Sequence, residues 1–271
     1  MCDYRTEVAG VTEEHLLDSP GDPDFMSSLA RGLAVLRCFA EQQRPMTIAQ
    51  ASIATGLSRA AVRRCLYTLA QLGYAAQEGP SYVLRPKTLA LGYAYLSSNS
   101  LLTRAQPILD QVRDQLHESC SLGVVEEDDV FYAARAEASR IMSVALQPGS
   151  RLPLYATSMG RVLLAGLARS ERETYLRRVD LVARTPRTVT DPHEMLALLD
   201  KVAEEGFAIV DQELELGLRS VAVPVLNSAR ATVAAINIGT QAARVPMAIL
   251  RSLYLPVLRG AAEELRLTGL T

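Results

Sequence analysis

A short run of side chains in the first quarter of the sequence has the chemistry to bind DNA. The run includes three arginines, whose planar guanidinium groups pair with the O6 and N7 atoms of guanine or with phosphate oxygens. On one face of a helix, such side chains are typical of a recognition helix that reaches base edges in the major groove. The residues that we expect to contact DNA are Ser58, Arg59, Ala60, Arg63, Arg64 and Tyr67.

The apolar residues interleaved with this run predict the helix that must present it. They recur at helical spacing and are Val62, Cys65, Leu66, Leu69 and Leu72. One face of a helix that begins near residue 58 is therefore apolar, and the candidate DNA-contacting side chains fall on the opposite, polar face.

A shorter helix is expected immediately before this one. Thr47 and Gln50 have the spacing of a capping box at its start. Gly56 is free to adopt the positive φ of a tight turn, and Ser58 can cap the helix that follows. We expect the short helix to turn Ile48, Ala51 and Ala54 inward, and Ile53 to face solvent. This arrangement indicates a helix-turn-helix, although an ordinary amphipathic helical hairpin with a solvated arginine face has the same pattern.

Flanking segments complete a winged helix over residues 27–85. Ser27 or Ser28 can cap a first helix, and short strands at 74–77 and 82–84 form a hairpin after the arginine-bearing helix. Between residues 27 and 87 there are eight Lys or Arg residues and two Asp or Glu residues, a local net charge of +6 in a chain whose net charge is −2. DNA binding requires such a local basic footprint.

The remaining segments predict three further regions. Residues 1–26 are rich in Asp and Glu and are expected to form a flexible acidic arm. Residues 86–100 are expected to form a linker helix that is apolar on more than one side, which suits packing against a second subunit. Residues 101–271 are expected to form an α+β domain with an antiparallel sheet flanked by helices.

The elements expected in this last domain follow from periodicity, capping residues and turns. The strands are expected at 121–126, 130–136, 141–146, 207–211, 221–226 and 232–239. The helices are expected at 101–119, within 152–167, from Ser170 to Arg178, from Asp191 to Glu205, and from Pro246 to Arg266 with a bend or break at Pro256.

Several function classes find no support in the sequence. No apolar run is long enough to span a membrane and no basic-then-apolar leader is present, so we expect a cytoplasmic protein. The four cysteines and three histidines are scattered, which argues against a metal site and favours reduced thiols. GxSxG, HExxH, GK[ST] and GxGxxG motifs are missing, so we expect no catalytic residues and no cofactor.

Four separated runs carry a resemblance to a known family. They are residues 28–39 (SLARGLAVLRCF), the helix-turn-helix, residues 140–167 (RIMSVALQPGSRLPLYATSMGRVLLAGL) and residues 211–225 (DQELELGLRSVAVPV). Together they resemble the IclR family of bacterial transcriptional regulators, and within it the PcaR, PcaU and PobR subgroup that controls catabolism of aromatic acids. The resemblance implies a winged helix, a linker helix and a C-terminal GAF-like effector domain. It also implies dimers through the DNA-binding domains, and often a dimer of dimers.

The same resemblance implies an effector pocket between the sheet and the loop before the buried helix. The positions that match the family's pocket are Ile141, Val144, Leu152, Ser158, Met159, Asp211, Ser220, Asn237 and Gly239. A helix N-terminus near Ser158 would offer N–H groups to a carboxylate, and Ser220 and Asn237 would offer hydrogen bonds. The arginines that could pair with an aromatic carboxylate are Arg135, Arg140 and Arg151.

We therefore expect a regulator that binds a double-stranded DNA operator and responds to a small organic, aromatic acid. One alternative is an enzyme that acts on a small acid and uses its N-terminal segment only to dimerise. Another is a regulator of the same family that responds to an acyl compound or a sugar acid.

Overall fold

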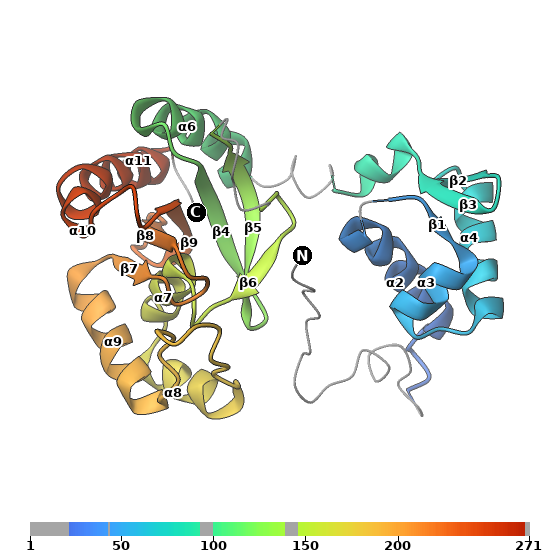
Figure 1. Ribbon diagram of the computed structural model, residues 1–271, viewed down its shortest axis with the longest axis horizontal. Coiled ribbons are helices and arrows are strands. Elements are labelled where there is room, and N and C mark those ends of the chain that lie inside the picture. The colour runs from blue at the N-terminus through green and yellow to red at the C-terminus, as the bar shows by residue number, and fades with distance from the viewer. Residues whose placement is uncertain (1–21, 43, 93–99, 139–145, 269–271) are drawn as a thin grey trace. The chain divides into compact units, whose positions relative to one another are not determined.

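The computed structural model describes residues 22–42, 44–92, 100–138 and 146–268. The chain divides into two compact units, residues 1–95 and 96–271, whose helices and strands are labelled in Figure 1. No helix in the described ranges is long and apolar enough to cross a membrane.

The N-terminal unit is a winged helix. Its three helices are α2 (Ser27–Gln42), α3 (Ile48–Thr55) and α4 (Arg59–Gln71). Its small antiparallel sheet has the order β1-β3-β2, from β1 (Met46–Thr47), β2 (Ala75–Glu78) and β3 (Ser81–Leu84). The wing hairpin was expected, whereas β1 was not, because two residues are too few to show a strand pattern.

Local signals set the geometry of the helix-turn-helix. The capping box forms, since Thr47 N donates to Gln50 Oε1 over 2.9 Å and Gln50 N donates to Thr47 Oγ1 over 3.3 Å. Gly56 ends α3 with a φ of +69°, and the Ser58 hydroxyl accepts the Ala61 N–H at 3.2 Å to start α4.

One prediction for α3 is wrong. Ala54 is exposed, while Ala51 is fully buried. The inward side of this short helix also carries Ser52 and Thr55, whose hydroxyls donate to backbone carbonyls, so Ala54 turns to solvent. Ile53 is exposed, as expected.

The C-terminal unit is built on a six-stranded antiparallel sheet with the order β6-β5-β4-β9-β8-β7. The strands are β4 (Cys120–Glu126), β5 (Asp129–Ala136), β6 (Arg151–Pro153), β7 (Ala208–Asp211), β8 (Leu218–Leu226) and β9 (Thr232–Gln241). Strand β6 lies in a segment expected to be a loop, and β8 begins earlier than expected. The expected strand at 141–146 lies almost wholly outside the described residues.

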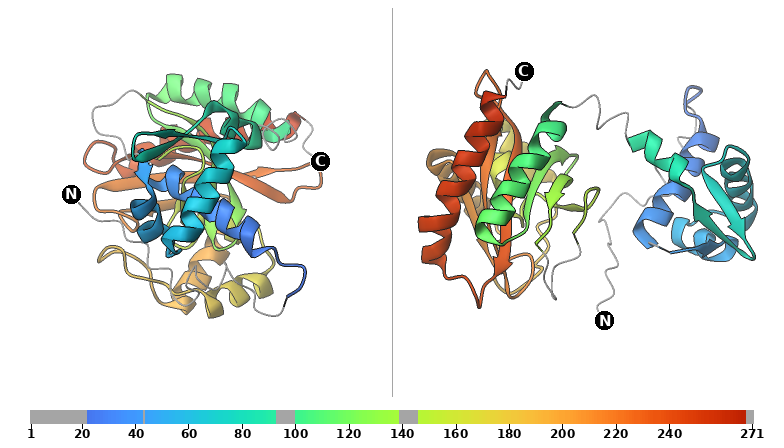
Figure 2. Two further views of the ribbon diagram at one scale, coloured as in Figure 1. Left: turned by 90° about the vertical axis from the view of Figure 1, so that its right-hand side faces the viewer. Right: turned by 90° about the horizontal axis from the view of Figure 1, so that it is seen from above.

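One face of this sheet is covered by helix α6 (Ser100–Leu116) and by the C-terminal helices α10 (Met247–Ile249) and α11 (Leu255–Leu267). Figure 2 shows α6 and α11 lying side by side over the strands. Between α10 and α11 the chain forms a π-helical turn, Leu250–Tyr254, directly before Pro256. Because proline has no N–H and crowds the preceding turn, the expected break at Pro256 takes this form.

The other face is covered by α7 (Ser158–Ala165), α8 (Arg169–Arg178) and α9 (Pro192–Glu205). Every residue of α7 from 158 to 164 is buried. Gly160 permits this close packing, because a Cβ atom at that position would lie 2.1 Å from the Leu154 carbonyl oxygen.

The expected start of α8 at Ser170 is wrong. The helix begins at Arg169 with Ala168 as its N-cap, and the Glu171 carboxylate accepts the Ala168 N–H at 2.8 Å. The Glu171 carboxylate thus satisfies the N–H of the N-cap residue, which is the half of a capping box that needs no hydroxyl at the N-cap. Of the expected linker helix, the described part comprises a 3₁₀ turn, Pro86–Thr88, and helical residues 89–92.

Candidate DNA-binding and effector sites

Helix α4 presents all six candidate DNA-contacting residues to solvent. Its inner face is anchored by Val62 and Leu66, which are fully buried. Ser58, Arg59, Ala60, Arg63, Arg64 and Tyr67 are all exposed. No hydrogen bond or ion pair with the described residues occupies the guanidinium groups of the three arginines, so their donors are available to a partner.

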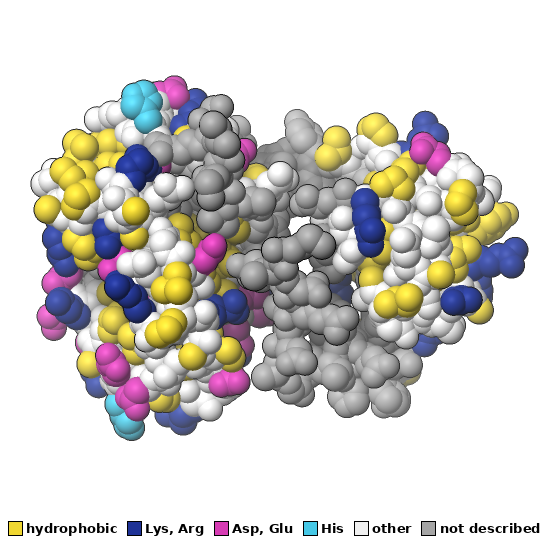
Figure 3. Space-filling view, in the orientation of Figure 1, with side chains coloured by type: hydrophobic (Ala, Val, Ile, Leu, Met, Phe, Trp, Pro, Cys, Tyr) yellow, Lys and Arg dark blue, Asp and Glu magenta, His cyan; other side chains and the backbone are white. Residues whose placement is uncertain are grey.

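Positive charge dominates the surface around this helix. In Figure 3, Lys and Arg side chains project from the edge of the N-terminal unit where α4 lies, with little Asp or Glu beside them. The wing adds no cation, because residues 75–84 contain no Lys or Arg, and its Glu78 side chain is exposed. Lys87 is engaged elsewhere: its Nζ donates to the Leu72 carbonyl over 2.8 Å and lies 4.9 Å from the centre of the Tyr74 ring.

The C-terminal unit contains a row of polar side chains across three neighbouring strands. Ser121 on β4 is paired with Arg135 on β5 and with Asn237 on β9. Since Cys120 and Leu122 pack into the core under α6, Ser121 and its two partners face the opposite side, toward α7. We call Ser121, Arg135 and Asn237 the polar row.

A β-bulge adds a tyrosine to the same face. The register shifts between Leu122 and Gly123, so that Ala133 is an extra residue between Tyr132 and Ala134. Tyr132 and Arg135 would point to opposite faces of a regular strand, but the extra residue brings both toward α7. Burial raises the pKa of Tyr132 to about 12, against the opposing influence of Arg135 and Asn237.

Arg135 is a partly buried cation with an unsatisfied donor. Its Nη1 donates to the Ser121 hydroxyl over 2.9 Å. Its Nε is buried and has no hydrogen-bond partner among the residues that the structure describes, and burial lowers the pKa of the guanidinium group. Within the described part of the chain no carboxylate forms a salt bridge with Arg135. A buried, unsatisfied donor of this kind is unfavourable, and a hydrogen bond to an anionic acceptor would remove that cost.

Helix α7 supplies the opposite wall. Ser158 is fully buried, and its hydroxyl also lacks a hydrogen-bond partner within the described ranges. Met159 reaches the sheet beside the polar row, where its Sδ and Cε lie 3.1 Å from the place that a Cβ on Gly123 would occupy. Glycine at 123 therefore makes room for the helix.

The other expected pocket residues divide into three groups. Ser220 and Gly239 are paired across β8 and β9 and face α7, and Leu152 on β6 is partly buried against the same core. Ile141, Val144 and Arg140 lie outside the described residues. Arg151 is exposed and pairs with Glu127 at 3.2 Å, so the structure does not bring it to the polar row.

Asp211 also lies away from the polar row. It is paired with Arg219, whose side chain faces the α11 side of the sheet and donates to the Val245 carbonyl over 2.6 Å. Arg219 and Arg187 bind the Asp211 carboxylate at 2.7 Å and 3.0 Å, and the hydrogen bond from Arg219 lowers its pKa. The geometry gives Asp211 a structural ion pair rather than a place beside Ser220.

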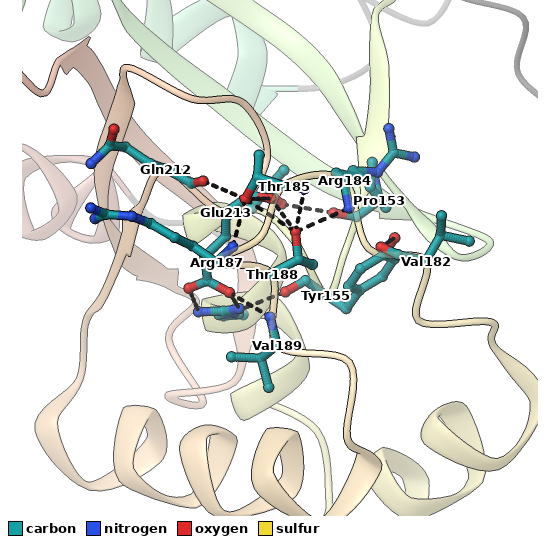
Figure 4. A network of polar contacts seen from close by, with 12 residues as sticks. Pro153, Tyr155, Val182, Arg184, Thr185, Arg187, Thr188, Val189, Gln212 and Glu213 are labelled. Atoms are coloured by element: carbon teal, nitrogen blue, oxygen red, sulfur yellow. Dashed lines mark hydrogen bonds and ion pairs between the residues drawn. The ribbon is translucent and has the colours of Figure 1, made fainter.

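A buried ion pair next to this wall was not anticipated. Arg161 on α7 is 1% exposed and binds Glu213 through two parallel contacts, Nη1 to Oε1 at 2.7 Å and Nη2 to Oε2 at 2.5 Å. Figure 4 shows the polar network around Glu213, in which the hydroxyls of Thr185 and Thr188 donate to the Glu213 carbonyl oxygen. An arginine inside an apolar helical run was the available signal, because a buried charge needs a partner.

Comparisons with known proteins agree with this architecture. Residues 28–79 match the IclR helix-turn-helix domain, and residues 93–266 match the C-terminal domain of bacterial transcriptional regulator IclR. The chain is 51% identical to the Pca regulon regulatory protein of Pseudomonas putida over 246 residues, which cover 90% of this chain and 84% of that protein.

Solved structures show the same likeness. A crystal structure of a candidate transcriptional regulator from Rhodococcus sp. RHA1 is 46% identical, with a TM-score of 0.82 over 90% of this chain and 98% of that one. The inducer-binding domain of a double mutant of the PobR transcription factor from Acinetobacter, in complex with 3-hydroxybenzoic acid, is 36% identical. Its TM-score is 0.58 over 60% of this chain and 96% of that one.

Proposed function

The chain belongs to the IclR family of bacterial transcriptional regulators, and we propose that it binds its operator through the exposed face of α4. Support comes from the six side chains that this face presents, from their unoccupied guanidinium donors and from the local positive charge. Matches to regulators along nearly the whole chain leave no role for the alternative of a small-acid enzyme. Action on chromosomal DNA implies a cytoplasmic protein.

We infer that the effector is a small aromatic carboxylate that binds between the polar row and α7. The unsatisfied Arg135 Nε carries this proposal, because it is a buried cationic donor in a domain whose relative binds 3-hydroxybenzoic acid. In this arrangement Arg135 holds the carboxylate, and Ser158 and Asn237 are available to ring hydroxyl groups. Leu152, Met159, Ser220 and Gly239 form the surrounding wall.

The proposed regulator acts as a dimer, as expected for a protein that reads two operator half-sites. The surface in its favour is an apolar stripe at the start of α2, where Met26, Leu29 and Leu33 are 65%, 57% and 49% exposed. Such a stripe on a small unit is suited to a second copy of the chain.

The DNA-binding proposal is tested with Arg63→Ala. Loss of a base or phosphate contact is expected to weaken operator binding by about 1–3 kcal/mol and, for a phosphate contact, to reduce the salt slope by about one. Fluorescence anisotropy with an operator duplex over a series of salt concentrations measures both. Arg177→Ala, at an exposed arginine on α8 of the other unit, is the matched control. Equal operator affinity of the two variants would refute the assignment of α4.

The effector proposal is tested by a thermal-shift panel of hydroxybenzoates, sugar acids and acyl compounds, since a ligand of the folded state raises the melting temperature. We expect a shift with a hydroxybenzoate, none with its carboxamide analogue, and none for the Arg135→Met variant. Arg151→Met, at an exposed arginine, is expected to respond like the wild type. A response to sugar acids or acyl compounds alone would favour the alternative metabolite class.

A further inference from the structure

We propose that Gln106 couples the effector site to the DNA-binding unit by tying the backbone of Arg135 to the first helix of the C-terminal unit. This inference rests on the proposed role of Arg135 in holding the effector carboxylate. It concerns regulation of that site, with Gln106 as a positioning residue that does not touch the effector.

Arg135 is contacted from both sides of the sheet. Its side chain lies on the α7 face with Ser121, while its carbonyl oxygen accepts a hydrogen bond from Gln106 Nε2 of α6 at 3.1 Å. Gln106 is partly buried, and the same Nε2 lies 3.5 Å from Asp110 Oδ1. One residue therefore joins the polar row to the helix on the opposite face.

The strand is locally adaptable at this point. The bulge at Ala133 interrupts the β4–β5 ladder two residues before Arg135. A bulge leaves its extra residue unpaired and disrupts the ladder of hydrogen bonds locally. A shift of the Arg135 peptide when its side chain gains an anion is therefore opposed by fewer ladder hydrogen bonds than in a regular strand.

Helix α6 has its own weak point at the same level. Pro107 lies inside it, directly after Gln106. Proline has no N–H to donate to the carbonyl four residues earlier, and it crowds the preceding turn, so helices bend there. The hydrogen bond from Gln106 to the Arg135 carbonyl therefore connects β5 to α6 directly before Pro107. This is the position where residues 100–106 can tilt relative to the remainder of α6.

The first half of α6 is the part that leads back along the chain to the DNA-binding unit. In the proposed mechanism, binding of an effector carboxylate to the Arg135 side chain shifts the peptide group of Arg135. The hydrogen bond to that peptide's carbonyl then moves Gln106, and residues 100–106 change their tilt relative to the rest of α6. An effector with different affinity for the two tilts shifts the population between them, and operator affinity changes with it.

The test is Gln106→Leu in the full-length protein, with 3-hydroxybenzoate as the probe. Operator affinity is measured with and without saturating probe, and probe affinity is measured by calorimetry. We expect probe affinity within about twofold of the wild type and a response of operator affinity that is reduced by roughly two- to tenfold, the range for loss of one neutral hydrogen bond. Gln106→Glu, which offers no donor, is expected to behave in the same way and serves if the leucine variant does not fold.

Two controls separate coupling from general damage. Gln111→Leu makes the same change at an exposed position of α6 and is expected to leave the response intact. Gln106→Lys keeps a donor that can reach the Arg135 carbonyl and is expected to retain most of the response. A wild-type response in Gln106→Leu or Gln106→Glu would overturn this inference while leaving the proposed function standing. If 3-hydroxybenzoate does not change the operator affinity of the wild-type protein, that result would overturn both the aromatic-acid proposal and this inference.

Discussion

The buried pair of Arg161 and Glu213 makes a strong quantitative prediction about stability. Three guanidinium donors are used, since Nε also donates to the Tyr155 carbonyl over 2.9 Å. The Glu213 carboxylate additionally accepts the Val189 N–H at 3.1 Å. The pair therefore connects α7, the loop after β7 and the segment between α8 and α9, and replacing one partner leaves the other charge buried.

The size of the effect follows from that burial. Side-chain exposure is 1% for Arg161 and 11% for Glu213, so water cannot solvate the charge that remains. Removing one partner of such a pair destabilises a protein by roughly 3–5 kcal/mol, whereas apolar replacement of both is often nearly neutral because neither charge remains. We expect Glu213→Leu and Arg161→Met each to fall in the first range. The double variant should be more stable than either single variant, although it still loses the bonds to Tyr155 and Val189.

Urea denaturation of the full chain at pH 7, followed by far-UV circular dichroism, measures the three free energies of unfolding, and an unchanged m-value makes them comparable. Glu173→Leu is the matched control, because its partner in an exposed i,i+4 pair, Arg169, is 59% exposed. This control is expected to change stability by no more than about 0.5 kcal/mol. If the two single effects simply add in the double variant, the pair is not energetically coupled and the reasoning is refuted.

Two further predictions concern packing and pH. Gly160→Ala is expected to lower the free energy of unfolding by about 3 kcal/mol or more, because the new Cβ meets the Leu154 backbone rather than a flexible side chain. Gly260→Ala, at a helical glycine with open space around it, should instead raise the free energy of unfolding by about 0.5–1 kcal/mol. Asp211, whose pKa is lowered from 3.8 chiefly by its hydrogen bond from Arg219, contributes stability above pH 3.8 that is lost as the pH falls through the lowered value. The stability difference between wild type and Asp211→Asn should therefore shrink in acid, and a difference that stays constant from neutral pH down to pH 2 would contradict this.

The DNA-binding unit could be predicted from sequence because its signals are local. The capping box at Thr47, the turn glycine at 56 and the cap at Ser58 each act within a few residues, and all three form as expected. The short strand β1 was missed because it is defined only by its partner in β3, more than thirty residues away. The error at Ala54 has a related cause, since in so short a helix the tertiary contacts decide which side turns inward.

The proposed effector site depends on contacts that no local pattern reveals. The polar row requires the register of β4 against both β5 and β9, and the bulge at Ala133 decides which face Arg135 occupies. Asp211 was expected in the pocket and is next in sequence to Val210, the partner of Ser220. Because successive side chains of a strand point to opposite faces, the Asp211 side chain lies on the other face of the sheet. Arg161 and Glu213 are 52 residues apart in the chain, so only the fold identifies them as partners.

The state of the guanidinium donors distinguishes three groups of described arginines that matter to the proposed function. On α4 the guanidinium groups are exposed and bind no other described residue, which suits the phosphates and base edges of DNA. Arg161 is buried and directs three of its N–H donors to a carboxylate and a carbonyl in the core, which makes it part of the protein's own packing. Arg135 lies between these cases, with Nη1 held by Ser121 and Nε buried and unsatisfied. Because an unmet buried donor costs free energy until an acceptor arrives, the surroundings of Arg135 suit the small anion that we propose as its ligand.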